Sequence, residues 1–324
     1  MILSHLLILT IPFLILTVTT NGLSPQRSIL VTGANKGQGY ALCERILSEH
    51  SDTHVFLCSR DAELGTAAKA RLLSTTGYSS DRVDVIQLDV TDPQSVKDAC
   101  VSVQNKLSKD RKLFGVVSNA GILWGHTLKE LVDVCTIGVR RVLDAFLPLM
   151  EGGGRVIVVS SGLGPLMHGY SSKERQDALV SPDTTWEDLE GMMNECLALS
   201  EQASPEQFEE IGFPGGPFAE SAPDFHMYGL AKMFADAYML SLSRTFKSLR
   251  INSCDPGLVY TDLIGKMPKY DGLAIEDTGA KTPKEGVEAA MRLLFGEEES
   301  GRFYAMSKDG TDLLHSAIDK MPNK

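Results

Sequence analysis

The sequence predicts a doubly wound α/β domain, in which helices cover both faces of a parallel sheet. Short apolar segments alternate along the chain with longer segments whose apolar residues recur at helical spacing. Because parallel neighbours need a crossover between them, this alternation is typical of a parallel sheet wrapped by helices. Polar or glycine-rich residues follow most of the apolar segments, which is where such a sheet binds ligands.

The predicted strands are short, continuous apolar runs, a pattern that indicates burial on both faces of the sheet. The first run, ILV with a preceding Ser, is followed at once by a glycine-rich turn. The strands are predicted at residues 28–31, 54–59, 83–89, 114–118, 155–160, 250–254 and 301–306.

Several predicted helices begin or end at clear signals. Asp61 is placed to cap the second helix, and Asp92-Pro93 opens the third, because Asp accepts free N–H groups and Pro suits a first turn. Three glycines at 152–154 end the long fourth helix. The helices are predicted at residues 40–49, 61–73, 92–109, 128–150, 223–247 and 283–295.

The alternation lapses between residues 162 and 224, where one helical piece near 186–199 stands in a polar stretch. A connection of this length is uncommon inside a compact domain, so we expect an insertion with helices of its own. No repeat or low-complexity linker divides the rest. We therefore expect one catalytic domain over residues 26–310, followed by a C-terminal tail at 311–324.

The N-terminal residues 1–22 are nearly all apolar, and no charged side chain precedes Arg27. Such a segment is a signal peptide or a short membrane anchor, which predicts the secretory pathway or association with the endoplasmic reticulum membrane. The segment lacks the Lys or Arg that usually begins a signal peptide. If it remains as an anchor, Arg27 and Lys36 follow it and favour a domain that faces the cytoplasm.

Composition narrows the classes of partner. The net charge of −11, without any basic run, argues against nucleic acid. The six cysteines are scattered singly, which indicates neither a zinc site nor a compact disulfide framework. None of the seven histidines has metal-ligand spacing, so no metal is expected.

A nucleotide site is predicted at the carboxyl ends of the strands. Gly33, Gly37 and Gly39 lie where a strand turns into a helix, and free N–H groups there, with the helix dipole, favour a pyrophosphate. A glycine trio alone is often only a turn. Similar clusters at successive strand ends indicate one continuous cleft: 33–39, 59–60, 89, 119–121 and 160–161.

Arg60 ends the second strand, 21 residues beyond Gly39, where an NAD site would hold an acidic residue. An arginine suits the 2′-phosphate of NADP instead, with Lys36 as a second cation. The alternative is a solvated surface arginine. NADPH is the cofactor that this position favours.

Tyr228 and Lys232 are four residues apart on a predicted helix, so they share one face. A free tyrosine has a pKa of about 10. A nearby ammonium favours the phenolate and brings the pair towards neutral pH, while a hydroxyl such as that of Ser161 could orient a carbonyl oxygen. Taken alone, this spacing also fits an ordinary helix face.

Together these residues resemble the short-chain dehydrogenase/reductases, which have a Rossmann-type fold, and most of all the NADPH-dependent carbonyl reductases. The motifs are residues 32–39, 119–121, Ser161, Tyr228-x-x-x-Lys232 and Pro256-Gly257. The resemblance implies reduction of aldehydes, ketones or quinones, with Ser161, Tyr228 and Lys232 as catalytic residues. It also implies a monomer, because the insertion covers the surface that other members use to form tetramers.

The resemblance further implies which residues bind NADPH. They are Gly33, Asn35, Lys36, Gly37, Gln38, Gly39, Arg60, Asp89, Val90, Asn119, Ala120, Gly121, Tyr228, Lys232, Pro256, Gly257, Val259 and Thr261.

One departure from the family concerns proton relay. Many members carry an asparagine that holds a relay water on the helix before the fifth strand, and here Cys135 has that position. A thiol is a weak hydrogen-bonding group, so slower turnover is expected. Two alternatives therefore stay open: a weakened NADP(H)-binding sensor or partner-binding protein, and a membrane-associated retinoid or steroid dehydrogenase.

Overall fold

The structure, a computed structural model, describes residues 27–107, 111–199, 204–265, 273–307 and 310–316. Its centre is one sheet with the strand order β3-β2-β1-β4-β5-β6-β7-β8. All neighbouring strands are parallel except β7 and β8. The strands are β1 Arg27–Val31, β2 Thr53–Ser59, β3 Val83–Gln87, β4 Leu113–Ser118, β5 Met150–Val159, β6 Arg250–Asp255, β7 Phe303–Met306 and β8 Leu313–Ser316.

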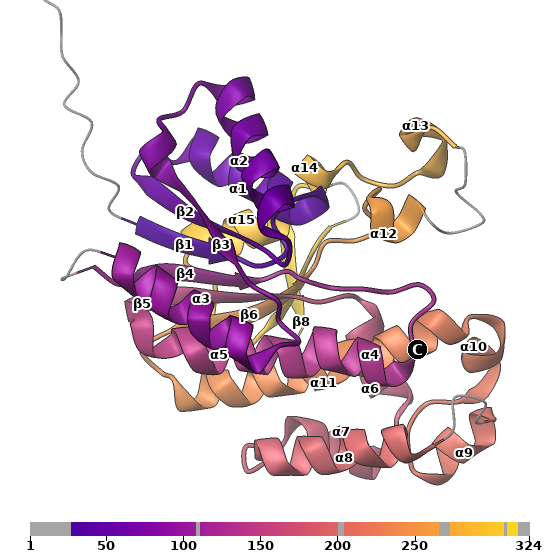
Figure 1. Cartoon of the computed structure of the whole chain (residues 1–324). Coiled ribbons are helices and arrows are strands. Elements are labelled where there is room, and N and C mark those ends of the chain that lie inside the picture. Colours follow the sequence, from indigo (N-terminus) through magenta and orange to yellow (C-terminus); the bar gives the residue numbers. More distant parts are fainter. Residues whose placement is uncertain (1–26, 108–110, 200–203, 266–272, 308–309, 317–324) are drawn as a thin grey trace, which may run out of the picture.

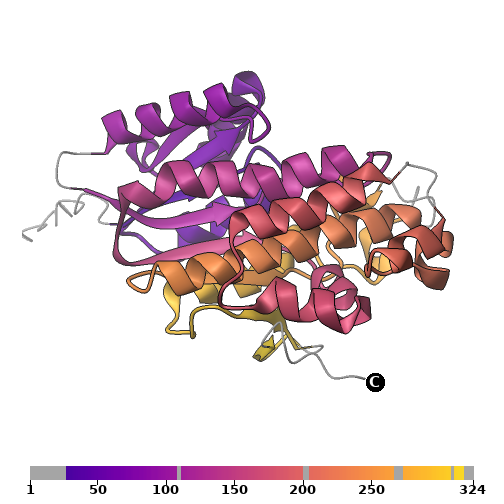
Figure 2. The same ribbon diagram turned by 90° about the horizontal axis from the view of Figure 1, so that it is seen from below.

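Helices cover both faces of the sheet, as predicted (Figure 1). The helices α1, α2 and α15 lie on one face, and α3, α5 and α11 lie on the other, where Figure 2 shows them running across the sheet. The helices are α1 Gly37–Glu49, α2 Ala62–Thr76, α3 Pro93–Lys106, α4 Leu128–Val132, α5 Gly138–Phe146, α6 Leu163–Tyr170, α7 Lys173–Val180, α8 Trp186–Ala198, α9 Pro205–Glu210, α10 Gly216–Ser221, α11 Pro223–Thr245, α12 Asp262–Gly265, α13 Ile275–Thr278, α14 Pro283–Gly286 and α15 Glu288–Phe295.

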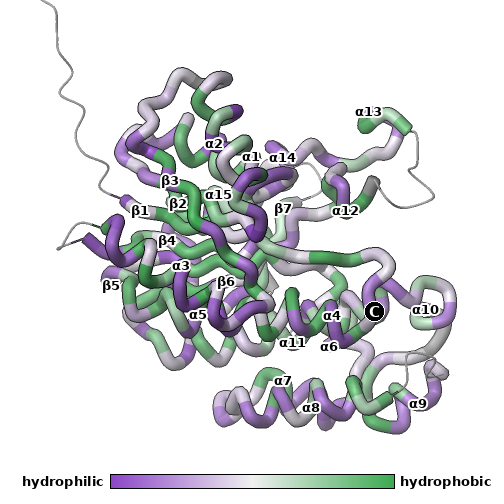
Figure 3. The backbone as a smooth tube through the Cα atoms, viewed as in Figure 1, coloured by the Kyte–Doolittle hydropathy of each residue, from purple (hydrophilic) through white to green (hydrophobic). Residues whose placement is uncertain are grey.

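The hydrophobic core consists of two clusters, one on each face of the sheet. Successive side chains of a strand point to opposite faces. Leu30 and Phe56 therefore pack with α3, α5 and α11, while Ile29 and Val55 pack with α1, α2 and α15. All four are essentially buried. In Figure 3 hydrophobic residues run through the strands, which explains why the runs do not alternate.

The insertion before α11 is helical. The described residues between β5 and α11 form α6 to α10 and no strand. Of these, α6, α7, α8 and α10 pack against α11, so that α11 has the sheet on one side and the insertion on another (Figure 1). A helix covered in this way is buried nearly all round, which is why its sequence shows little amphipathic pattern.

Three predictions of local structure need correction. The long helix predicted at 128–150 is interrupted by a π-helical turn at Asp133–Ile137 and a 3-10 turn at Leu147–Leu149. The glycines at 152–154 do not precede the fifth strand but lie within β5. The predicted tail contains β8, whose antiparallel pairing with β7 adds an eighth strand.

Among the described residues, no helix combines the length and apolar composition that crossing a bilayer requires. The predicted leader, residues 1–22, lies outside the described residues. Its targeting role stays a prediction.

Candidate active site

The ends of β1 and β4 are joined by a buried threonine. The Thr32 hydroxyl oxygen accepts hydrogen bonds from the backbone N–H groups of Asn119, at 2.9 Å, and Ala120, at 3.0 Å. The Asn119 side-chain amide donates in return to the carbonyl oxygen of Thr32, at 2.9 Å. These bonds hold the glycine-rich loop against the loop that begins at Asn119, so two of the predicted cofactor segments lie together.

The glycine-rich loop has a conformation that needs its glycines. Gly33 and Gly37 have φ angles of +63° and +56°, in the left-handed region. A Cβ atom at Gly39 would lie 2.5 Å from the carbonyl oxygen of Gly33 and 2.6 Å from the Asn119 amide nitrogen. The loop is thus packed too tightly at this point for any side chain.

The N-terminus of α1 fits a phosphate group. This helix begins at Gly37, and its N-cap residue Lys36 makes no side-chain cap. No acidic residue lies in its first turn, which includes Gln38 and Gly39. The first N–H groups of a helix carry partial positive charge, so this end is suited to a pyrophosphate.

The two cations predicted for the 2′-phosphate differ in their surroundings. Arg60 is exposed at the end of β2, and within the described residues its guanidinium has no hydrogen bond or ion pair. Lys36 instead pairs with Asp262 at 2.5 Å, and both side chains are about two-thirds exposed. An exposed pair of this kind is worth about 1 kcal/mol or less, so a phosphate dianion could replace the carboxylate.

Arg71 of α2 is a neighbour of this loop that sequence reasoning missed. Its guanidinium lies 3.9 Å from the Tyr40 ring centroid and donates to the Asn35 carbonyl oxygen at 3.3 Å. No local pattern links these positions, because α1 and α2 meet only in the folded chain.

Asp89 and Val90 follow β3 at the same edge. One Asp89 carboxylate oxygen accepts bonds from the N–H and the hydroxyl of Thr91, at 2.9 and 2.7 Å. This fixes the loop. Val90 is buried against Gly138 of α5. A Cβ atom at Gly138 would lie 2.9 Å from the Val90 side chain.

The segment after β6 returns to the glycine-rich loop. Gly257 has a φ of +77°, and its N–H donates to Asp255 at 2.9 Å, which turns the chain sharply. Val259 forms an isolated bridge with Lys281. Thr261 then lies beside Gly37, 3.4 Å from the position of a Cβ there. The predicted segments 33–39, 119–121 and 256–261 therefore surround one region.

Close packing between α6 and α11 holds the segment that follows Ser161 against the part of α11 that carries Tyr228 and Lys232. A Cβ at Gly164 of α6 would lie 3.2 Å from the backbone of Lys232, and one at Gly229 of α11 would lie 2.7 Å from Met167. Ser161 lies two residues before the start of α6 and is partly exposed. Its hydroxyl accepts the Leu163 N–H at 3.3 Å.

Tyr228 and Lys232 form a buried pair on α11. The Lys232 ammonium lies 5.4 Å from the centroid of the Tyr228 ring and donates to the Val159 carbonyl oxygen at 2.8 Å. Only 8% of Tyr228 and 3% of Lys232 is exposed. The hydrogen bond to the last residue of β5 anchors the lysine beside the strand that leads to Ser161.

Burial dominates the electrostatics of this pair. It raises the pKa of Tyr228 to about 12, although the charge of Lys232 acts in the opposite direction. Burial opposes the charge of Lys232, but Tyr228, Cys135 and Asp236 together raise the lysine pKa above its ordinary value. The expectation that the lysine brings the pair towards neutral pH is therefore correct in the direction of its effect and wrong in the net result. In this state the tyrosine holds its proton.

Cys135 lies in the π-helical turn and is fully buried. Its thiol contacts the Ile122 carbonyl oxygen at 3.7 Å, a weak hydrogen bond. The next residue, Thr136, donates to the Ala231 carbonyl oxygen at 2.7 Å and so joins this turn to α11. A thiol rather than an amide thus lies near Tyr228 and Lys232.

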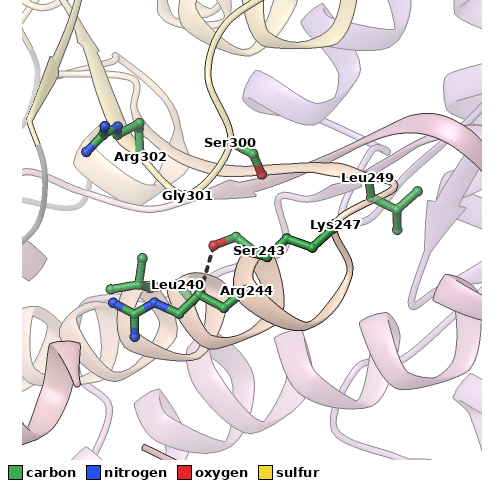
Figure 4. Close-up of a pocket in the computed structure, with 8 residues that line it drawn as sticks. All are labelled: Leu240, Ser243, Arg244, Lys247, Leu249, Ser300, Gly301 and Arg302. Atoms are coloured by element: carbon green, nitrogen blue, oxygen red, sulfur yellow. Dashed lines mark hydrogen bonds between the residues drawn. The ribbon is translucent and has the colours of Figure 1, made fainter. Parts of the chain in front are cut away.

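Two cavities lie elsewhere. One, of about 290 Å³, is at the end of α11 beside the β6–β7 connection and is lined by residues that include Ser243, Lys247 and Arg302 (Figure 4). The other, of about 270 Å³, lies between α1 and α15. Neither contains a residue predicted to bind the cofactor or substrate. Over the described residues, no three His, Cys, Asp or Glu side chains are grouped as metal ligands.

A family model, curated sequences and solved structures all relate this chain to short-chain dehydrogenases and reductases. A family model described as short chain dehydrogenase matches residues 27–173. The chain is similar to carbonyl reductase 1 (NADPH) of Mus musculus, with 30% identity over 82% of this chain and 89% of that one. It is 29% identical to short-chain dehydrogenase/reductase 1 of Saponaria officinalis, over 88% of this chain and 96% of that one. The solved structure of salutaridine reductase from Papaver somniferum has a TM-score of 0.69 at 23% identity, covering 86% and 99% of the two chains.

Proposed function

The chain belongs to the short chain dehydrogenase family, an oxidoreductase family, and from this premise we propose that it is an NADPH-dependent carbonyl reductase. Its substrate would be an aldehyde, ketone or quinone. The observation that carries the proposal is the buried pair on α11: Tyr228 holds a proton beside the charged Lys232, at the edge of the sheet where the cofactor loops meet.

Each catalytic residue has a separate task in this proposal. NADPH, when bound, supplies the hydride for the carbonyl carbon. The Ser161 hydroxyl orients the carbonyl oxygen, and the Tyr228 hydroxyl donates its proton to that oxygen. The ammonium of Lys232 then stabilises the phenolate that remains. A tyrosine that keeps its proton at neutral pH is suited to this direction of reaction.

The preference for NADPH over NADH is part of the proposal. Arg60 supports it, because an exposed guanidinium without a partner stands at the end of β2. Guanidinium groups bind phosphate through two parallel hydrogen bonds. The similarity to a mouse carbonyl reductase that is named for NADPH supports the same choice.

We also propose that the protein is a monomer. The insertion supports this, since α7 and α8 pack against α11 and α8 packs against α4, and so cover helices that would otherwise present a wide surface. Sedimentation of the purified chain tests it, and a dimer or tetramer would contradict it.

The experiment for the main proposal follows NADPH oxidation by the full chain with a panel of aldehydes, quinones, retinoids and ketosteroids. Tyr228→Phe removes the proton donor alone and should abolish turnover. Tyr238→Phe is the matched control, because this tyrosine is on the same helix but bonds to Asp144 at 2.8 Å, away from the site. Turnover lost in both variants, or in neither, would contradict the assignment.

Cys135 keeps a second function under consideration. If the chain binds NADPH but turns over no carbonyl in the panel, it is a nucleotide-dependent sensor or partner-binding protein. Activity confined to retinoids or ketosteroids would instead favour a lipid dehydrogenase.

A further inference from the structure

At the carboxyl edge of the sheet, β6 ends in a carboxyl group that the proposed reaction does not use. This group belongs to Asp255, the last residue of the strand. The neighbouring strands β5 and β6 are in register up to Val159 and Cys254, and the Ser160 N–H continues the ladder with a bond of 2.7 Å to the Cys254 carbonyl oxygen. This register places Asp255 next to the chain that leaves β5 at Ser160 and Ser161.

One oxygen of the Asp255 carboxylate holds the start of a predicted cofactor segment. It accepts the N–H of Gly257, two residues further on, at 2.9 Å. This is an Asx-turn, in which a side-chain oxygen replaces a backbone acceptor. The turn opens the segment 256–261, whose far end, Thr261, lies beside the glycine-rich loop at Gly37.

The other oxygen of this carboxylate contacts Gly162, on the neighbouring segment. A Cβ atom at Gly162 would lie 3.1 Å from it, which is closer than an ordinary van der Waals contact. The Gly162 N–H also donates a hydrogen bond to the carboxyl group and favours its charged form. The Asp255 side chain therefore joins the segment after β5 to the segment after β6.

The start of α6 explains why a carboxylate is stable at this position. Gly162 is the N-cap residue of that helix and has no side chain with which to accept the first N–H groups. Asp255 brings an anion to this end from a different strand, where the helix dipole favours negative charge. Ser161 precedes the N-cap, and its hydroxyl accepts the Leu163 N–H at 3.3 Å. The direction of the Ser161 hydroxyl thus depends on how the start of α6 is held.

Donors and cations surround the Asp255 carboxyl group. Burial raises its pKa, while the N–H groups of Gly257 and Gly162 and then the charges of Lys281 and Lys232 act in the opposite direction. Lys281 lies against the same turn, because its ammonium nitrogen would be 3.3 Å from a Cβ at Gly257. These groups favour a carboxylate that stays in contact with both segments.

We propose that Asp255 is a positioning residue of the candidate active site, whose carboxylate bridges Gly162 and Gly257 and so fixes the Ser161 hydroxyl relative to the cofactor segment 256–261. Its catalytic meaning rests on the proposed function, in which Ser161 orients the carbonyl oxygen. The bridge itself is a property of the folded chain and can be measured without turnover.

Asp255→Asn breaks one side of this bridge. Asn forms the same Asx-turn, so its amide oxygen can keep the Gly257 N–H, while its NH2 group faces the Gly162 N–H and cannot accept it. Hydrogen exchange resolved by nuclear magnetic resonance measures both N–H groups. We expect exchange at Gly162 to become about tenfold faster or more, as for a lost hydrogen bond to a charged group. Exchange at Gly257 should change by less than about twofold.

Asp255→Ser is a second neutral variant. Its single, shorter oxygen can keep a turn at Gly257 but cannot also accept the Gly162 N–H, so exchange at Gly162 should again become faster. A folded neutral variant in which Gly162 exchanges as in the unaltered protein would overturn the proposal. Failure of both neutral variants to fold would overturn it too, since the proposal assigns the placement of Ser161 to this carboxylate and not the stability of the fold.

Asp92→Asn is the matched control. Asp92 also accepts a backbone N–H two residues further on, that of Gln94 at 2.9 Å, but it does so at the start of α3. The control should leave exchange at Gly162 and Gly257 unchanged. Faster exchange at Gly162 in the control as well would mean that the effect is not specific to Asp255 and would overturn the proposal.

A double-mutant cycle with Ser161→Ala provides the catalytic readout. If Asp255 acts through Ser161, Asp255→Asn should lower kcat by about tenfold in the unaltered chain but by less than about twofold in Ser161→Ala. The dissociation constant for NADPH should change by less than about twofold, because the cofactor segment keeps its turn. An equal loss of kcat in both backgrounds would overturn the proposal. If the unaltered chain reduces no carbonyl, the proposed function fails, yet hydrogen exchange still decides whether Asp255 holds the segment that carries Ser161.

Discussion

Replacing Gly33 of the glycine-rich loop by Ala should lower the free energy of unfolding through two effects, a left-handed backbone and overpacking. Gly77→Ala, at the end of α2, is the matched control for the first effect. Both glycines have left-handed backbones, with φ angles of +63° and +66°. At Gly77 nothing lies within 4 Å of an added Cβ, whereas at Gly33 the Cβ would lie 2.9 Å from the Cα of Ala120. The two variants thus share the conformational cost and differ in the close approach of β1 and β4.

The magnitudes follow from that difference. An alanine in the left-handed region costs about 1–2 kcal/mol, which should be the whole effect at Gly77. Overpacking adds about 1–3 kcal/mol, so Gly33→Ala should cost about 2–5 kcal/mol in total. Urea unfolding measures the free energies. The loop of Gly33→Ala should relieve the overpacking by shifting away from Ala120, and NADPH binding would have to restore the original loop. If that restoration costs about 1.4 kcal/mol, within the range above, isothermal titration with NADPH should show roughly tenfold weaker binding. Equal losses of stability in the two variants, or unchanged binding, would refute the reasoning.

Three further outcomes are expected. Arg60→Asp should weaken NADPH binding by about tenfold or more while NADH binding is little changed, because a charge-assisted hydrogen bond is worth about 1.5–3 kcal/mol. The ratio of the dissociation constants for NADPH and NADH measures this effect. An equal loss of affinity for both nucleotides would contradict it. Cys135→Asn should raise the rate of carbonyl reduction, since an amide can hold a relay water that a thiol binds poorly. Stopped-flow assays measure this rate, and an unchanged rate would count against a proton relay at this position. Burial raises the pKa of Asp236 in the folded protein to about 7, so its stabilising contribution is complete below about pH 4 and is lost as the pH rises to about 7, a loss of about 4 kcal/mol. Asp236→Asn should therefore flatten the decrease in the free energy of unfolding between about pH 4 and pH 7, measured with urea.

The sheet could be predicted because its strands are buried on both faces, which leaves a strong local signal. Leu30 and Ile29 point to opposite core clusters, so the run that contains them must be apolar throughout. The starts of two helices could be predicted from their capping residues. The Asp61 and Asp92 side chains do accept backbone N–H groups in the first turns of their helices, at 2.9 Å each. These features depend on residues within a few positions of one another.

The features that could not be predicted depend on distant partners. The strand β8 forms because β7 offers an edge, and its own four residues show no distinctive strand pattern. The pairing of Lys36 with Asp262 spans 226 positions. Asp236 could have been noticed at four residues from Lys232, but a lone Asp in a helix usually faces solvent, and only the packing of α6 shows that this one is enclosed.

The strand order has a consequence for the order of folding. Central β1 pairs with β2 and β4, and among the described strands only β7 and β8 pair as antiparallel neighbours. Every parallel pairing needs a crossover, so native contacts join residues far apart in the sequence and form slowly. The cofactor loops follow β1, β4 and β6, and the bond from Asn119 to Thr32 spans 87 positions. During refolding, recovery of nucleotide binding should therefore trail recovery of helical circular dichroism and report the last stage of assembly.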